Sequence, residues 1–218
     1  MGKNILIVSA TAKEIEPLLN IVRQNSGLLN RHTIDVLVSG IGLTASTYHL
    51  TRQLRMKRPD LVIQAGVAGC FDKRIALGNV VAVKQDTIAD ESVIELKKLR
   101  TLFDLKLVPQ NKFPFTGGWL VNKNKAISKT KLKKVKGISV NQITSSKQMI
   151  NFYRENFNPV VESMEGAALH YVCLSEKIPF IQLRSISNYI GERNKKNWNM
   201  KDSILNLNKE LLRLLDNI

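Results

Sequence analysis

The sequence predicts an α/β fold: a single domain, residues 1–218, with a central mixed, mostly parallel β-sheet flanked by helices. Short runs of β-branched and apolar residues alternate along the chain with segments of helical periodicity, which is typical of strands joined by crossover helices. Many of these runs are apolar at consecutive positions, as expected for strands covered on both faces. No internal repeat, linker or break in composition divides the 218 residues.

Several segments have the length and composition of strands, and others have the apolar periodicity of helices. The expected strands are residues 4–9, 33–39, 61–65, 80–84, 138–143, 160–163 and 180–187. The expected helices are residues 14–23, 43–55, 147–156, 165–176 and 202–216, the last with a broad leucine stripe for packing on the sheet. Residues 107–120 contain two prolines and a Gly-Gly pair, so we expect no continuous structure there.

The chain is strongly basic but otherwise ordinary in composition. It has 33 Lys and Arg against 18 Asp and Glu, a formal net charge of +15, with 44% hydrophobic and 23% charged residues. These proportions exclude a disordered or fibrous chain. A run of lysines within residues 123–136 has apolar residues at near-helical spacing, which we interpret as the solvated face of a surface helix. A basic nucleic-acid-binding protein is the alternative from another class, but the run lacks interleaved aromatic residues, so we expect no nucleic-acid partner.

Other features bear on location and on metals. No apolar run approaches the ~18 residues of a membrane span, and the first residues lead into a predicted strand without the apolar region of a signal peptide. Cys70 and Cys173 lie far apart in apolar surroundings, which is typical neither of a disulfide framework nor of a metal cluster. The three histidines have no ligand spacing, and His170 lies on an apolar helix as a core residue would. We therefore expect a cytoplasmic protein without metal or membrane partners.

Two glycine-rich turns each follow a predicted strand. The first, GIGLTA at residues 40–45, resembles the dinucleotide-binding pattern, but that pattern needs an acid at the end of the next strand. Asp60 lies at the beginning of that strand instead, so a nicotinamide cofactor is disfavoured. The second turn is residues 66–69. Both are compatible with plain tight turns, and both also allow a ligand to approach the backbone closely.

The carboxyl ends of parallel strands meet at one edge of a sheet, so loops 9–13, 39–42, 66–69 and 187–188 should face one another. Glu14 and Glu165 lie close to these loops. Glu14 fits a capping box with Thr11 and could serve the helix alone. Glu165 is followed by Gly166 and two alanines, which are small enough for a ligand or another element to approach.

Four segments, taken together, resemble the nucleoside phosphorylase and hydrolase superfamily of the purine nucleoside phosphorylase type. They are ILIVSATAKEIE (5–16), SGIGLTAS (39–46), QAGVAGCF (64–71), and VESMEGAA with SISN (161–168 and 185–188). Their order and spacing match across nearly the whole chain. Within the superfamily, VNQIT (140–144), HYVC (170–173) and SNYIGERNKKNW (187–198) are most similar to the futalosine hydrolases of the menaquinone pathway. The methylthioadenosine/S-adenosylhomocysteine nucleosidases are the alternative.

The resemblance implies roles for individual residues. Glu14 corresponds to the acid that activates the attacking water. Glu165 corresponds to the acid that binds the ribose hydroxyls, and Met164 lies against the sugar. Ser187 and Asn188 match the Ser-Asp pair that meets the purine.

The remaining expected contacts lie around the base and at the far end of the substrate. Ile41, Ala68, Gly69, Ile143 and Thr144 should line the nucleoside pocket. Arg193 is a candidate for the carboxylate on the aromatic tail of futalosine. The resemblance further implies a homodimer or higher homo-oligomer and no cofactor.

Two departures from related enzymes predict the reaction. Phosphorylases of the superfamily carry an arginine in the first loop and a hydroxyl in the second glycine turn, whereas residues 9–14 contain no arginine and Val67 has no hydroxyl. An anion would be repelled by Glu14 and would lack a cationic clamp, so water is the expected nucleophile. Asn188 stands where adenine-releasing nucleosidases have aspartate, and its amide can donate to a 6-oxopurine. Asparagine is also common in plain turns. The sequence therefore predicts hydrolysis of futalosine to hypoxanthine and dehypoxanthine futalosine.

Overall fold

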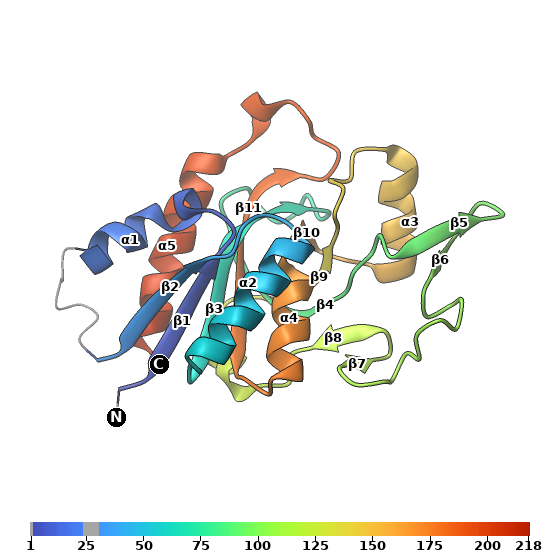
Figure 1. Ribbon diagram of the computed structural model, residues 1–218. Helices are drawn as coiled ribbons and strands as arrows, with labels where there is room; N and C mark the ends of the chain where they lie inside the picture. The colour runs from blue at the N-terminus through green and yellow to red at the C-terminus, as the bar shows by residue number, and fades with distance from the viewer. Residues whose placement is uncertain (1, 24–30) are drawn as a thin grey trace.

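A nine-stranded mixed sheet forms the centre of the computed structural model, which describes residues 2–23 and 31–218 (Figure 1). The strands are β1 (Asn4–Ser9), β2 (Thr33–Val38), β3 (Leu61–Cys70), β4 (Val80–Asp86), β5 (Ser92–Glu95), β6 (Lys98–Thr101), β7 (Phe115–Thr116), β8 (Trp119–Val121), β9 (Lys134–Ser139), β10 (Val161–Ser163) and β11 (Phe180–Tyr189). The α-helices are α1 (Glu16–Arg23), α2 (Leu43–Met56), α3 (Lys147–Phe157), α4 (Gly166–Ser175) and α5 (Met200–Asp216). Strands β5 and β6 form a separate hairpin.

Five strands of the sheet, β3, β10, β9, β4 and β11, pair with one another in a closed circuit. The order of the sheet is β2-β1-β3-β10-β9-β4-β8-β7, and β11 pairs with both β3 and β4. Five of these pairings are parallel and four are antiparallel. Strand β3 pairs with β1 over its first half and with β10 at its end, while β11 runs parallel along nearly its whole length. The end of β3 therefore brings several strand ends together.

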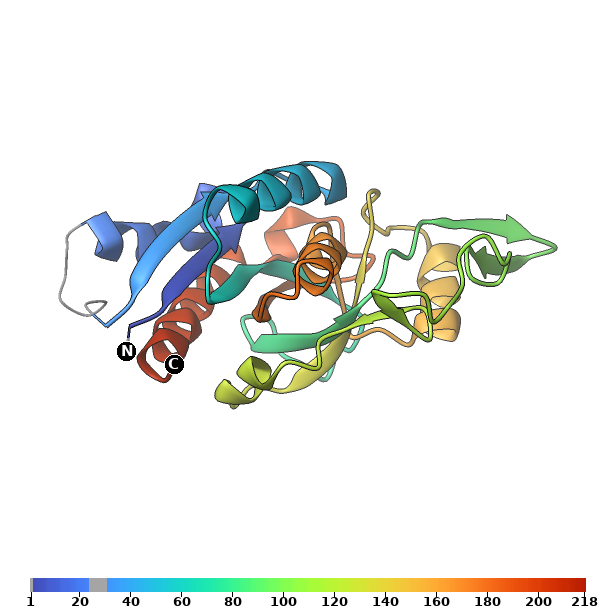
Figure 2. The ribbon, with the colours of Figure 1, turned by 60° about the horizontal axis from the view of Figure 1, so that its bottom comes forward.

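Helices cover both faces of the sheet (Figure 2). Alternate residues of β1 show the division, because Ile5 and Ile7 pack in one apolar cluster and Leu6 and Val8 in another. The first cluster includes the buried leucines of α5, and the second includes residues of α2 and α4. Burial on both faces explains the consecutive apolar residues of these strands.

The predicted fold class, a mixed sheet flanked by helices, is confirmed. Helices α2, α3, α4 and α5 and strand β1 lie where the periodicity placed them, to within two residues. The expected helix from residue 14 is divided into a 3-10 turn, Ala12–Ile15, and then α1. The segment 107–120 is largely irregular but contains the short strand β7 and the beginning of β8.

Two predictions around the lysine-rich segment were wrong. Residues 123–136 do not form a surface helix: a short 3-10 turn, Lys125–Lys129, is followed by β9. The strand expected at 138–143 lies at Lys134–Ser139 instead. Val135 is buried between exposed Lys134 and Lys136, and pairing of Val135 with Val83 of β4 favours the two-residue period over the helical one. The lysines of the segment are exposed, as expected of a solvated face.

None of the described helices is long and apolar enough to cross a membrane.

Candidate active site

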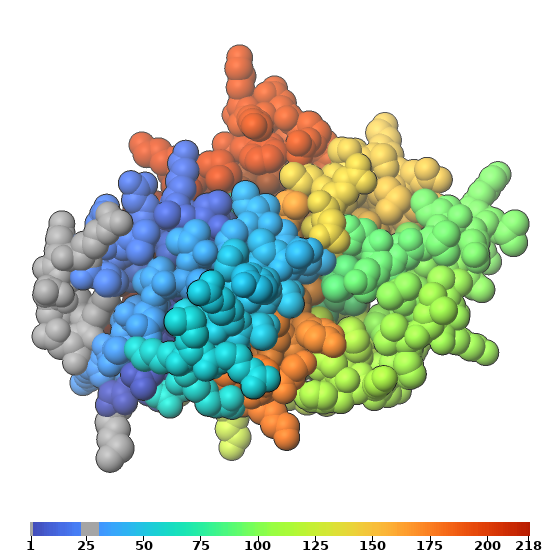
Figure 3. Space-filling model, viewed as in Figure 1, coloured from blue at the N-terminus to red at the C-terminus, as the bar shows by residue number. Residues whose placement is uncertain are grey.

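A cavity of about 330 Å³ lies where β1, β3, β10 and β11 end. All four segments that the sequence placed together contribute to it, but residues 66–69 lie within β3 and residues 187–188 within β11, rather than in loops as predicted. Its lining residues are Ala10, Thr11, Glu14, Ile41, Val67, Ala68, Gly69, Ile143, Glu162, Ser163, Met164, Glu165, Ser187, Asn188, Ile190, Trp198 and Met200. The space-filling view shows the segments that carry them meeting on one face of the molecule: blue near residues 10 and 41, yellow near 143 and orange-red near 198 (Figure 3).

Glu14 is held by four hydrogen-bond donors. Its Oε2 accepts from the Ser9 hydroxyl at 3.2 Å and from the Thr11 N–H and hydroxyl at 3.1 and 3.0 Å. Its Oε1 accepts from the Val67 N–H at 3.0 Å. The Thr11 contact is the capping box expected from the sequence, yet the same carboxyl group lines the cavity. The capping and the functional interpretations of Glu14 are therefore compatible.

Glu165, at the N-terminal end of α4, is paired with a buried arginine. Its Oε2 lies 3.6 Å from Nη2 of Arg184 in β11, and its Oε1 accepts from the Gly42 N–H at 3.1 Å. Arg184 is only 1% exposed, and its Nη2 also donates to Gln64 Oε1 at 2.8 Å. Burial raises the pKa of Glu165, whereas the Arg184 guanidinium and the Gly42 N–H oppose that rise.

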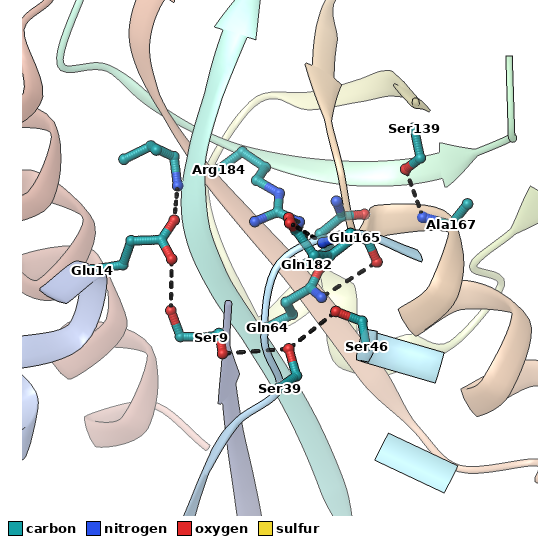
Figure 4. Close-up of polar contacts among 12 residues, drawn as sticks. Ser9, Glu14, Ser39, Ser46, Gln64, Ser139, Glu165, Ala167, Gln182 and Arg184 are labelled. Atoms are coloured by element: carbon teal, nitrogen blue, oxygen red, sulfur yellow. Dashed lines mark hydrogen bonds and ion pairs between the residues drawn. The ribbon is translucent and has the colours of Figure 1, made fainter. Parts of the chain in front are cut away.

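The guanidinium of Arg184 lies between Glu165 and Glu14 (Figure 4). Gly66 makes this possible, because a Cβ at that position would lie 2.1 Å from Arg184 Nη1 and 3.0 Å from Glu14 Oε1. The glycine expected to allow a ligand to approach the backbone thus allows the approach of two charged side chains. The two acids and the arginine form one buried charge cluster at the cavity.

Asn188 and Ser187 lie at the other end of the cavity. The Ser187 hydroxyl donates to Asn188 Oδ1 at 2.9 Å, and Asn188 Nδ2 donates to the Tyr189 carbonyl at 3.2 Å. A Cβ built on Gly69 would lie 3.4 Å from Asn188 Nδ2. The amide therefore keeps a second N–H near Gly69 at the cavity wall.

The structure brings most of the predicted site residues together and places two outside the lining. Thr144 is buried behind the cavity, where its N–H donates to Glu162 Oε1 at 3.0 Å. The guanidinium of Arg193 lies 5.8 Å from the ring centre of Trp198, which does line the cavity. Arg193 therefore does not line the cavity itself but lies beside Trp198, which does.

Sequence reasoning missed Arg184, Glu162 and Trp198. A usable signal for Arg184 was a single charged residue within the apolar run FIQLRSIS, because a buried charge needs a nearby partner. Glu162 is on β10, three residues before Glu165, and lies in the VESMEGAA segment, but it was given no role there. Trp198 ends the SNYIGERNKKNW segment and was also given no role, although it reaches the cavity from the loop after β11.

Another buried carboxyl group, that of Asp86, helps to hold the helix turn that follows Glu165. Its Oδ1 accepts from the Ser139 hydroxyl at 3.0 Å, and that hydroxyl accepts from the Ala167 N–H at 2.7 Å. Its Oδ2 is so close to Gly166 that a Cβ there would lie 2.2 Å away. Asp86 and Ser139 thereby fix the first turn of α4, which carries Glu165.

Among the described residues, no group of three or more His, Cys, Asp or Glu has the geometry to hold a metal ion.

The family model of the phosphorylase superfamily matches residues 4–217. The chain belongs to this superfamily. That membership confirms the resemblance seen in the sequence. A curated relative, the 5′-methylthioadenosine/S-adenosylhomocysteine nucleosidase of Haemophilus ducreyi, is 27% identical over 208 residues, which are 86% of each chain.

Solved structures of this superfamily share the fold. A mutant of the Helicobacter pylori methylthioadenosine nucleosidase with 5′-methylthioadenosine in its active site has a TM-score of 0.82 at 23% identity, covering 100% of both chains. The futalosine hydrolase of Helicobacter pylori has a TM-score of 0.80 at 22% identity, covering 99% of this chain and 98% of that one. The relatives are nucleosidases, which confirms the predicted enzyme class, an N-glycosyl hydrolase.

The free energy of unfolding of this protein should depend on pH because of Asp86. Burial raises the pKa of Asp86 from its ordinary value of 3.8 to about 7. Between these values the unfolded chain loses the proton while the folded chain keeps it, so the free energy of unfolding falls as pH rises. The slope is up to about 1.4 kcal/mol per pH unit. Asp86→Asn removes this term, so its stability relative to the wild type should increase from pH 4 to pH 7, as measured by urea denaturation.

Asp216→Asn is the matched control, because Asp216 is exposed at the end of α5. Its stability should follow that of the wild type at every pH. If Asp86→Asn also does so, the folded protein holds Asp86 ionised throughout this range.

Proposed function

We propose that this enzyme hydrolyses the N-glycosidic bond of futalosine, releasing hypoxanthine and dehypoxanthine futalosine. The observation that carries the proposal is the placement of Asn188 in the same cavity as Glu14 and Glu165. An amide at the base end and carboxyl groups at the sugar end match a 6-oxopurine nucleoside.

At the sugar, Glu165 stabilises the positive charge that develops on the ribose as the bond breaks. An interaction that strengthens in the transition state raises the rate of the chemical step. One oxygen of Glu165 takes the Gly42 N–H and the other lies near Arg184, which fixes the plane of the carboxyl group. The remaining lone pairs are available to the ribose hydroxyls. Met164, the preceding residue, lies against the sugar.

Glu14 acts as the general base that takes a proton from the attacking water. General base catalysis contributes typically ~10²–10⁴-fold to a rate. The donors from Ser9, Thr11 and Val67 orient this carboxyl group at the cavity wall. Phosphate is a poor alternative nucleophile here, because three acids, Glu14, Glu162 and Glu165, line the cavity and Arg184 is already engaged by Glu165 and Gln64.

At the base, Asn188 donates its free N–H to the 6-oxygen of hypoxanthine. The Oδ1 of Asn188 is oriented by the Ser187 hydroxyl, and its Nδ2 lies next to the space above Gly69, which lines the cavity. Asparagine cannot supply the proton that the leaving base needs, so solvent supplies it. At the far end of the substrate, Arg193 beside Trp198 binds the carboxylate of the aromatic tail.

Methylthioadenosine and S-adenosylhomocysteine are the alternative substrates. The observation in their favour is the name of the curated relatives, which share 27% identity over most of the chain. These substrates carry a 6-amino group, so the base end of the cavity distinguishes the two possibilities.

The direct test is chromatography of the free base released from a panel of nucleosides, with and without phosphate. We expect hypoxanthine from futalosine, poor release of adenine from methylthioadenosine, and equal rates with and without phosphate. Efficient adenine release would support the alternative, and a phosphate requirement would contradict hydrolysis.

Glu14→Gln separates the catalytic role of this residue from its capping role. Glutamine can still accept the Thr11 N–H in the capping box, but it cannot take a proton from water. We expect kcat for futalosine to fall at least ~10²-fold, with only a modest loss of thermal stability, because the amide NH₂ cannot accept the Val67 N–H. Glu16→Gln, an exposed change two residues away, should leave both unaltered. Wild-type turnover in Glu14→Gln would leave Glu14 as a cap only.

Asn188→Asp should move base preference toward 6-aminopurines. A carboxylate presents lone pairs to the 6-oxygen of hypoxanthine but accepts from a 6-amino group. A mismatched buried polar pair costs about 1–3 kcal/mol, so the ratio of kcat/KM for futalosine to that for methylthioadenosine should fall about ten- to a hundredfold. Asn151→Asp on the exposed face of α3 is the matched control. An unchanged ratio in Asn188→Asp would exclude Asn188 from base recognition.

A further inference from the structure

Glu162 is a buried acid in the cavity wall that has no role in the reaction as described so far. It is 5% exposed, and its Oε1 accepts from the Thr144 N–H at 3.0 Å. Its Oε2 is buried with no hydrogen-bond partner among the described residues. A buried polar atom left unpaired costs free energy, so such an atom at a cavity indicates a missing donor from a ligand.

The sheet places Glu162 opposite Asn188. Glu162 of β10 pairs with Gly69 of β3, and Gly69 pairs with Asn188 of β11 on its other side. Residues directly paired across strands project to the same face of a sheet. A bulge in β11 between Ile186 and Asn188 interrupts this alternation, so the shared cavity lining is what places Glu162 and Asn188 together. Their backbones lie two strand spacings, about 9–10 Å, apart.

The wall between these two residues is apolar. A Cβ on Gly69 would lie 2.4 Å from Ile190 Cδ1, so the Ile190 side chain covers Gly69. Glu162, Ile190 and Asn188 all line the cavity. The result is an apolar wall with a polar group on each side of it, which suits two neighbouring polar atoms on one edge of a purine ring.

We propose that Glu162 determines base specificity: its Oε2 accepts a hydrogen bond from the N1–H of a 6-oxopurine whose adjacent 6-oxygen is bound by Asn188. This rests on the proposed function, because it assigns the neighbouring polar atom of the same base. A 6-aminopurine presents a lone pair at N1, which the carboxylate repels. The pair of residues thus selects hypoxanthine-type bases through one donor and one acceptor.

The ionisation of Glu162 is consistent with this pairing. Burial raises the pKa of Glu162, and the Thr144 N–H opposes that rise. A second N–H from the base adds another donor to the carboxylate, so the bound base stabilises its charged form.

Glu162→Gln replaces the acceptor Oε2 with a donor NH₂ group of nearly the same size. The Thr144 N–H retains the amide oxygen at the Oε1 position, so the amide NH₂ takes the place of Oε2. That donor faces the N1–H of hypoxanthine but matches the N1 lone pair of adenine. The variant should therefore exchange the preference of the enzyme between the two bases.

The experiment is isothermal titration calorimetry of the wild type and Glu162→Gln with hypoxanthine and with adenine. We expect the affinity for hypoxanthine to fall about ten- to a hundredfold and that for adenine to rise. Glu155→Gln, an exposed change on α3, is the matched control and should bind both bases as the wild type does. Unchanged affinities in Glu162→Gln, or equal losses for both bases, would overturn the proposal.

Further measurements keep the test independent of folding and of the proposed function. In the wild type, 1-methylhypoxanthine lacks the N1–H and should bind at least tenfold more weakly than hypoxanthine. Equal binding of the two would overturn the proposal without any variant. If futalosine is cleaved but Glu162→Gln keeps the wild-type base preference, the proposed function stands and the role of Glu162 fails. If the wild type releases adenine rather than hypoxanthine, the proposed function itself fails.

Discussion

A single buried guanidinium, that of Arg184, is the constraint on which the site depends. A charge with 1% exposure needs partners, because the cost of removing it from water exceeds any gain from packing. Glu165 and Gln64 are the partners, and they come from α4 and β3. Gly66 leaves the space in which Arg184 reaches the side of Glu14. The charge cluster therefore links β3, β11 and α4 at the point where the cavity forms.

The sheet determines why these groups meet where they do. Strand β3 pairs with β1 at its beginning and with β10 at its end on one side, while β11 pairs with it on the other side along nearly its whole length. Residues at its end thus face side chains from two different neighbours. One neighbour supplies Glu162 and the other Asn188, and the Met164-Glu165 pair follows directly after β10. A closed circuit of strands brings to one cavity residues that are more than a hundred positions apart in sequence.

Local patterns in the sequence predicted what depends on local forces. The capping box at Thr11 and Glu14, the ends of β1 and the first glycine turn before α2 are fixed by neighbouring residues, and the structure shows them where expected. The prediction of a second glycine turn at residues 66–69 was wrong, because pairing with β11 continues β3 to Cys70. The lysine-rich segment was misjudged because strand pairing of Val135 with Val83 decided its conformation. Arg184 and Glu162 were missed for the same kind of reason. Their partners, Glu165 and Thr144, are brought to them only by the assembled sheet.

The two ends of the cavity differ in how much of the fold they involve. The sugar end depends on shared contacts: Glu14 also caps a helix turn, and Glu165 stands on a turn fixed by Ser139 and Asp86. A change there disturbs structure as well as chemistry. At the base end, the Asn188 side chain is hydrogen-bonded to its immediate neighbours, Ser187 and Tyr189, and to no other described residue. Base preference can therefore change through single residues while the bond-breaking machinery stays fixed, which is how one fold can serve nucleosidases with different bases.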